Sequence, residues 1–137
     1  LVHRLTGRFV IDHYSAANSS PLYLPDQLAY SDTLADDIIA LDKLPEPAWT
    51  TDVAGTVTQR AAEETSLAAG TPVIVGTIDA AAEALSVGVL APGDMMLMYG
   101  STIFIIEITP RRRMTPGWFV ISCGRSTIRG AKKSISS

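Results

Sequence analysis

Apolar residues along the chain follow two alternating spacings, which predict strands and helices in turn. A run rich in branched and aromatic residues over 8–16 (RFVIDHYSA) predicts a strand, and the turn-forming residues of 18–26 predict a loop after it. Behind Ser31 or Asp32 as a helix N-cap, the segment 31–42 carries apolar residues at helical spacing (Leu34, Ile38 and Leu41). We therefore expect a strand, a loop and a short amphipathic helix in this order.

The middle of the chain repeats the alternation. Residues 58–70 (TQRAAEETSLAAG) predict a helix that begins after Thr58 as its N-cap. The compact apolar run 71–78 (TPVIVGTI) predicts a strand buried on both faces, and 79–89 returns to helical spacing. Strand, helix, strand and helix in succession indicate an α/β fold class.

The two ends of this pattern predict a helix terminus and a hairpin. Residues 1–7 (LVHRLTG) resemble the last turn of a helix closed by Gly7, so we expect the chain to begin inside a larger structure. Residues 94–108 (DMMLMYGSTIFIIEI) predict two apolar strands that meet at a turn over 99–102. Three methionines of this segment are expected to fill a core (Met95, Met96 and Met98).

Composition favours a globular protein over a disordered or membrane-spanning one. The 137 residues suit one domain or a piece of one, and 47% of them are hydrophobic against 18% charged. No apolar run of about 18 residues occurs, and the first residues lack the apolar core of a signal peptide. We expect a cytoplasmic protein, and the lone Cys123 indicates neither a disulfide nor a zinc site.

Charge divides the chain sharply. Residues 1–107 hold all 14 acids and four bases, a net charge of −10, whereas 108–137 hold seven bases and no acid. This abrupt change in net charge marks 108–137 as a basic tail that differs from the rest of the chain.

The two histidines, His3 and His13, lack metal-ligand spacing and are expected to be surface or core residues.

Asp79 stands where the predicted strand ends and the helix of 79–89 begins. One interpretation is an N-cap, whose carboxylate accepts hydrogen bonds from the first backbone N–H groups of the helix. The other is a functional acid, because small neighbours leave room for a ligand at the strand end, where open α/β sheets bind one (Gly76, Ala80, Ala81 and Ala82). The residues themselves leave both interpretations open.

The turn of the predicted hairpin also has two interpretations. Gly100 would let backbone N–H groups approach a ligand, and the hydroxyls of Ser101 and Thr102 could donate to phosphate oxygens. The same residues also suit an ordinary tight turn. Neither GxxxxGK[ST] nor GxGxxG occurs, so the usual P-loop and dinucleotide fingerprints are absent.

Residues 70–105 (GTPVIVGTIDAAAEALSVGVLAPGDMMLMYGSTIFI) closely resemble the middle of the FGGY carbohydrate kinases, and 5–23 and 44–57 resemble the segments that precede it. The resemblance implies a fragment of an actin-like ATPase (ribonuclease H-like) fold. It also implies that 1–90 close the sugar-binding domain and that 91–107 form the first hairpin of the ATP-binding domain. Asp12 and Asn18 could face the sugar cleft.

The activity that the resemblance implies is transfer of the ATP γ-phosphate to a sugar (pentulose-like) or polyol hydroxyl, with Mg²⁺. The acid at the position of Asp79 is then the general base. Gly100, Ser101 and Thr102 would hold the ATP phosphates, although YGST departs from the commoner Gly-Thr-Ser or Gly-Thr-Gly. No residue is assigned as a metal ligand.

The family's Asp-x-Gly-Thr and Gly-Gly segments do not occur, so the isolated chain is expected to be inactive. The tail 108–137 is unlike the family and resembles translation of a shifted reading frame. The alternative is a non-catalytic α/β binding or interaction protein that self-associates through exposed strands. Binding of nucleic acid by the tail is not favoured, because no recognisable binding fold accompanies it.

Overall fold

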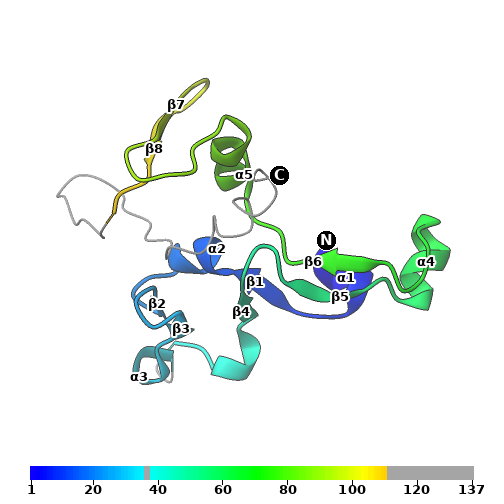
Figure 1. Ribbon diagram of the computed structural model, residues 1–137. Helices are drawn as coiled ribbons and strands as arrows, with labels where there is room; N and C mark the ends of the chain where they lie inside the picture. Colours follow the sequence, from blue (N-terminus) through cyan, green and yellow to red (C-terminus); the bar gives the residue numbers. More distant parts are fainter. Residues whose placement is uncertain (36–37, 111–137) are drawn as a thin grey trace. The chain divides into compact units, whose positions relative to one another are not determined.

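The computed structural model describes residues 1–35 and 38–110 (Figure 1). These residues fall into two units that meet after Thr77, and each is considered by itself. These two units are defined by contacts within this chain. They do not test the domain division expected at residue 90, which stays a prediction. Cys123 and the basic residues from Arg111 onward lie outside the described residues.

The first unit consists of short helices and two-stranded sheets (Figure 1). Its helices are α1 (Val2–Thr6), α2 (His13–Ala17), α3 (Asp32–Ala35), the 3-10 turn η1 (Leu41–Lys43) and α4 (Gln59–Thr65). Its strands are β1 (Val10–Asp12), β2 (Tyr23–Leu24), β3 (Ala29–Tyr30), β4 (Glu46–Ala48), β5 (Val53–Thr56) and β6 (Pro72–Ile74). β1 pairs with β4 in parallel, while the pairs β2–β3 and β5–β6 are antiparallel.

Two predicted helix ends are confirmed in this unit. Gly7 closes α1 with φ 75°, the left-handed conformation that glycine adopts without strain, and its N–H donates to the His3 carbonyl. Thr58 caps α4 through its side chain, which accepts from the Ala61 N–H.

α1 also contacts β5 at Gly55, where an added Cβ would lie 3.1 Å from the Thr6 Cβ. The sheet and helix therefore approach too closely there for a larger residue.

The strand predicted over 8–16 is wrong beyond Asp12. The Asp12 carboxylate accepts from both the N–H and the hydroxyl of Ser15, so it caps α2 and turns the chain into a helix at His13. Branched and aromatic residues favour a strand where no helix cap forms hydrogen bonds with the backbone. The composition of residues 8–16 therefore predicts a strand and does not reveal the cap at Asp12.

The helix predicted over 31–42 is also shorter than expected. Ser31 is confirmed as its cap, since its hydroxyl accepts from the Leu34 N–H, but the described part of α3 ends at Ala35. The chain then makes a separate turn, η1. The three apolar residues at helical spacing are all exposed among the described residues (Leu34, Ile38 and Leu41).

The strand predicted from 71–78 is not buried on both faces. β6 covers only Pro72–Ile74, pairs antiparallel with β5, and leaves the Ile74 side chain 53% exposed. A compact apolar run indicates burial only where neighbouring layers cover it. Within the described residues of this unit, parallel pairing occurs between β1 and β4 instead.

The second unit contains the predicted helix and the predicted hairpin, which pack against each other. It contains α5 (Asp79–Ser86), β7 (Met95–Tyr99) and β8 (Ile103–Glu107), and the two strands pair antiparallel with Tyr99 opposite Ile103. The Asp94 carboxylate accepts from the Leu90 and Ala91 N–H groups and so fixes the turn before β7. These backbone donors hold the pKa of Asp94 below its ordinary value.

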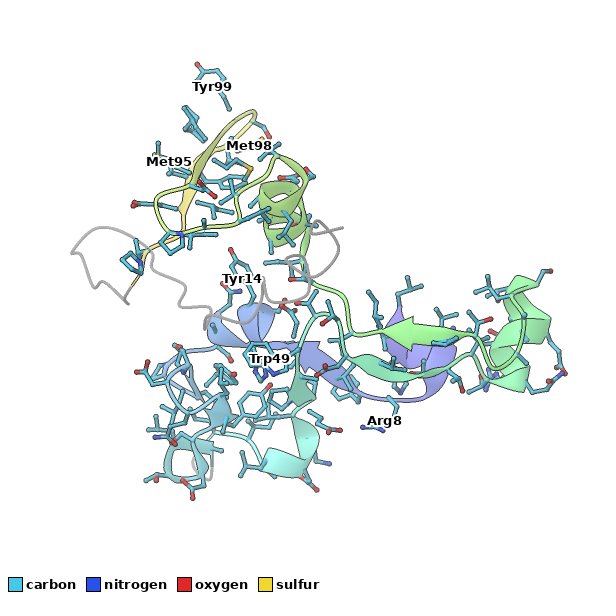
Figure 2. The ribbon with its side chains drawn as sticks, in the orientation of Figure 1. Arg8, Tyr14, Trp49, Met95, Met98 and Tyr99 are labelled. Carbon is cyan, nitrogen blue, oxygen red and sulfur yellow. The ribbon has the colours of Figure 1, made fainter. Side chains whose placement is uncertain are left out.

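One face of the hairpin packs on α5 and the other does not. The packed face brings Met98 and Phe104 against a small core of Ala84, Val89 and Met96, and Figure 2 shows Met98 on the side toward α5. The opposite face is exposed and apolar (Met95, Leu97, Tyr99, Ile103 and Ile105). The predicted core role is confirmed for Met96 and Met98 and is wrong for Met95, which is 61% exposed.

Candidate functional site

A pocket of about 320 Å³ lies between α5 and the tip of the hairpin, within the second unit. α5 contributes Asp79, Ala80 and Glu83 to its lining. The hairpin contributes the remaining residues (Met98, Gly100, Ser101, Thr102 and Phe104). The four residues singled out from the sequence, Asp79 and the Gly100–Ser101–Thr102 turn, therefore lie around one space although about 20 positions separate them.

Asp79 is the first residue of α5 and its side chain is exposed. The N-cap is Ile78, and among the described residues the Asp79 carboxylate accepts only from the adjacent Ala80 N–H, at 2.8 Å. The interpretation of Asp79 as the N-cap is therefore wrong. Its carboxylate still lies in the first turn, where the partial positive charge of the helix N-terminus favours an anion.

Glu83 is a pocket residue that sequence reasoning missed. It follows Asp79 by four positions, which places both residues on one face of a helix. Neither carboxylate forms an ion pair with a described residue, because the ion pairs of the described chain are Arg8–Glu46 and Arg60–Glu64. The i, i+4 spacing was the signal that could have identified Glu83.

The hairpin turn presents two hydroxyls to the pocket. Ser101 and Thr102 are exposed, and neither hydroxyl forms a hydrogen bond within the described residues. The Gly100 N–H donates to the Thr102 carbonyl at 3.1 Å, which closes the turn. A Cβ added at Gly100 would meet only that carbonyl oxygen, at 3.9 Å, so the turn leaves open space beside Gly100.

Two further sequence candidates, Asp12 and Asn18, have structural contacts in the first unit. Asp12 is buried, and its carboxylate accepts from Ser15 and from the Thr77 hydroxyl. The Asn18 side chain donates to the carbonyls of Tyr14 and Ser15 at the end of α2. The hydrogen bonds of both side chains are therefore accounted for by the local structure.

His13 is a buried histidine whose polar contact is satisfied, as expected. Its Nδ1 lies 2.6 Å from the Tyr23 hydroxyl, and its ring contacts Trp49 edge to face at 4.1 Å between centroids. Burial lowers the pKa of His13 and, with the nearby charges of Tyr30 and Asp12, raises the pKa of Tyr23 to about 12. No group of three metal-ligating side chains occurs within residues 1–35 and 38–110.

No protein-family model matches the chain. Among curated proteins, a ribulokinase from Bacillus licheniformis is 34% identical over 80 residues, which are 58% of this chain and 14% of that protein. No helix in the described part of the chain is long and apolar enough to cross a membrane.

Solved structures of xylulose kinases share the fold of this chain. A ligand-bound xylulose kinase from Lactobacillus acidophilus matches with a TM-score of 0.79 at 21% identity, over 90% of this chain and 26% of that one. A xylulose kinase from Rhodospirillum rubrum matches with a TM-score of 0.73 at 32% identity, over 83% of this chain and 23% of that one. This chain thus spans about a quarter of the length of each structure.

These matches confirm the resemblance predicted over about residues 1–107, because they combine sequence identity with a shared fold over most of the chain. The α/β fold is that of part of an actin-like ATPase. In sequence and fold, the chain is therefore similar to a segment of the FGGY carbohydrate kinases.

Proposed function

We propose that the chain is a segment of an ATP-dependent carbohydrate kinase, which transfers the γ-phosphate of ATP to a hydroxyl of a sugar or polyol. The observation that carries the proposal is the pocket that joins Asp79 to the Gly100–Ser101–Thr102 turn. The similarity to proteins named ribulokinase and xylulose kinase favours a pentulose-like acceptor. Use of ATP favours a cytoplasmic location.

Asp79 is the proposed general base. Phosphoryl transfer has a loose transition state, so a carboxylate needs only to orient the acceptor hydroxyl and take its proton as the new oxygen–phosphorus bond forms. The exposed Asp79 carboxylate faces the pocket from the first turn of α5, whose positive end stabilises the ionised form. Small Ala80 beside it leaves room for the acceptor.

The hairpin turn is the proposed phosphate contact. The hydroxyls of Ser101 and Thr102 can donate to phosphate oxygens, and the open space beside Gly100 lets the phosphate approach the backbone. The pocket's carboxylate and hydroxyl oxygens are hard donors of the kind that suit Mg²⁺. Bound Mg²⁺ would neutralise charge on the phosphates during transfer.

The remaining contacts of the ATP and the sugar are proposed to come from the rest of the parent protein. Because the chain spans 14% of the ribulokinase and 23% of the xylulose kinase from Rhodospirillum rubrum, it can contain only part of a two-substrate site. We therefore expect no ADP release by the isolated 137-residue chain with any pentulose or polyol.

Binding at the turn tests the proposal directly. Addition of MgATP to the isotopically labelled chain is expected to shift the amide resonances of Gly100, Ser101 and Thr102. Gly100→Ala should weaken this binding, since the added methyl occupies the open space without a clash in the turn. If MgATP at millimolar concentration leaves these three resonances unmoved, the phosphate assignment is wrong.

A second candidate function is a non-catalytic interaction protein, and one observation favours it. The outer face of the hairpin is apolar and exposed across both strands, with Leu97 58% and Ile103 62% exposed. An uncovered face of this kind promotes association. Self-association of the chain in sedimentation velocity, reduced by Leu97→Lys, would support this function, whereas a monomer at high concentration would count against it.

A further inference from the structure

The connection between β6 and α5, residues 75–78, has no regular secondary structure, yet its first half is held in place. The Val75 N–H donates to the Asp52 carbonyl, and the Gly76 N–H donates to the Thr50 carbonyl, each at 3.0 Å. Backbone hydrogen bonds therefore fix the first two residues of the connection.

The hydroxyl of Thr77 continues this series with a side-chain bond. It donates to the Asp12 carboxylate at 2.9 Å, and Asp12 is only 4% exposed. The same carboxylate accepts from the N–H and the hydroxyl of Ser15. A buried polar group whose partners are all in place is rigid, so Asp12 gives Thr77 a fixed point of attachment.

The first turn of α5 has no capping side chain of its own. N-cap residues are usually Ser, Thr, Asp or Asn, whose side chains accept from the first N–H groups of the helix. The N-cap of α5 is Ile78, which makes no such bond, and Asp79 follows it. Thr77 is therefore the polar side chain that anchors the chain immediately before this helix.

We propose that Thr77 is a positioning residue for Asp79, the proposed base, an inference that rests on the proposed function. Its bond to Asp12 fixes the backbone two residues before Asp79. Phosphoryl transfer depends mainly on positioning, and a displacement of about 1 Å can cost about a hundredfold in rate. Thr77 does not line the pocket, so it acts through the direction of the chain that carries the base.

The test is the mobility of the backbone at Ile78 and Asp79 in the isotopically labelled 137-residue chain. Nitrogen-15 relaxation is expected to give order parameters of about 0.85 in the wild type and below about 0.6 in Thr77→Val, which lacks the hydroxyl. Thr77→Ser keeps the hydroxyl and should restore the wild-type values. The wild-type chain alone also tests the inference, because values below about 0.6 at both residues would overturn it.

Ser15→Ala is the matched control for a general loss of stability. It removes a hydroxyl donor from the same buried carboxylate and leaves the Thr77 bond in place, so both variants should destabilise the first unit. Only Thr77→Val should loosen Ile78 and Asp79. An equal loss of order in both variants would show that Thr77 has a structural role alone, which would overturn the inference.

MgATP binding at the hairpin turn tests the proposed function separately. If MgATP shifts the Gly100–Thr102 amides while Thr77→Val leaves Ile78 and Asp79 ordered, this inference is wrong and the proposed function stands. If MgATP shifts none of these amides, the proposed function fails. The inference then falls with it, even where Thr77→Val loosens the start of α5.

Discussion

The hydroxyl of Thr77 donates to the Asp12 carboxylate at 2.9 Å, which joins two residues 65 positions apart in sequence. The same buried carboxylate caps α2 through Ser15. Asp12 therefore joins the end of β1 to Thr77, the last described residue of the first unit. A buried carboxylate needs such donors, because an ionised group without partners is costly to bury.

Loss of the Thr77 hydroxyl should destabilise the first unit. Thr77→Val removes one donor from a buried charged acceptor, and we expect a loss of about 1.5–3 kcal/mol in the free energy of unfolding. Urea denaturation followed by circular dichroism measures this loss. Thr51→Val is the control, since Thr51 is exposed and its hydroxyl forms no hydrogen bond within the described residues; its effect should stay within about 0.5 kcal/mol.

Acid should destabilise the chain through His13. Burial lowers the pKa of His13 in the folded state below the ordinary value of 6.5, so the unfolded state binds the proton more readily. Stability is therefore expected to fall as the pH drops through 6.5, and to stop falling below the folded-state pKa. Urea midpoints between pH 5 and 7.5 measure the slope. If His13→Gln, which cannot titrate, keeps the full slope, another group is responsible.

High pH should destabilise the chain through Tyr23. Burial raises the pKa of the Tyr23 phenol to about 12, against an ordinary value of 10.0, so the folded state holds its proton more tightly than the unfolded state. Stability should be complete below pH 10 and decline between pH 10 and 12. An ultraviolet titration of tyrosinate should contain a component near pH 12 that is missing from Tyr23→Phe.

Two neighbouring methionines of β7 should respond very differently to truncation. Met96→Ala opens a cavity in the small core with Ala84 and Val89, and the expected loss is about 2–4 kcal/mol. Met95 is 61% exposed on the other face, so Met95→Ala should cost about 0.5 kcal/mol or less. Hydrogen exchange of the β7 and β8 amides measures both. Equal effects would mean that the hairpin does not pack on α5 through this face.

Features that depend on a few adjacent residues could be predicted from the sequence. The caps at Ser31 and Thr58 and the left-handed Gly7 were identified correctly, because a side chain or a glycine within three or four positions decides each of them. The hairpin of residues 94–108 was predicted for the same reason. The kinase resemblance also rests on a contiguous motif, residues 70–105.

Features that depend on packing could not be predicted. The pairing of β6 with β5, the exposure of Ile74 and the bond between Thr77 and Asp12 each require contacts between distant residues. The position of Glu83 in the pocket lining is a further example, because its spacing from Asp79 places it on a helix face without showing what lies opposite. The packing of Ala84 and Val89 against Met96 brings that face to the hairpin turn, since burial of apolar surface, which is not directional, decides which elements meet.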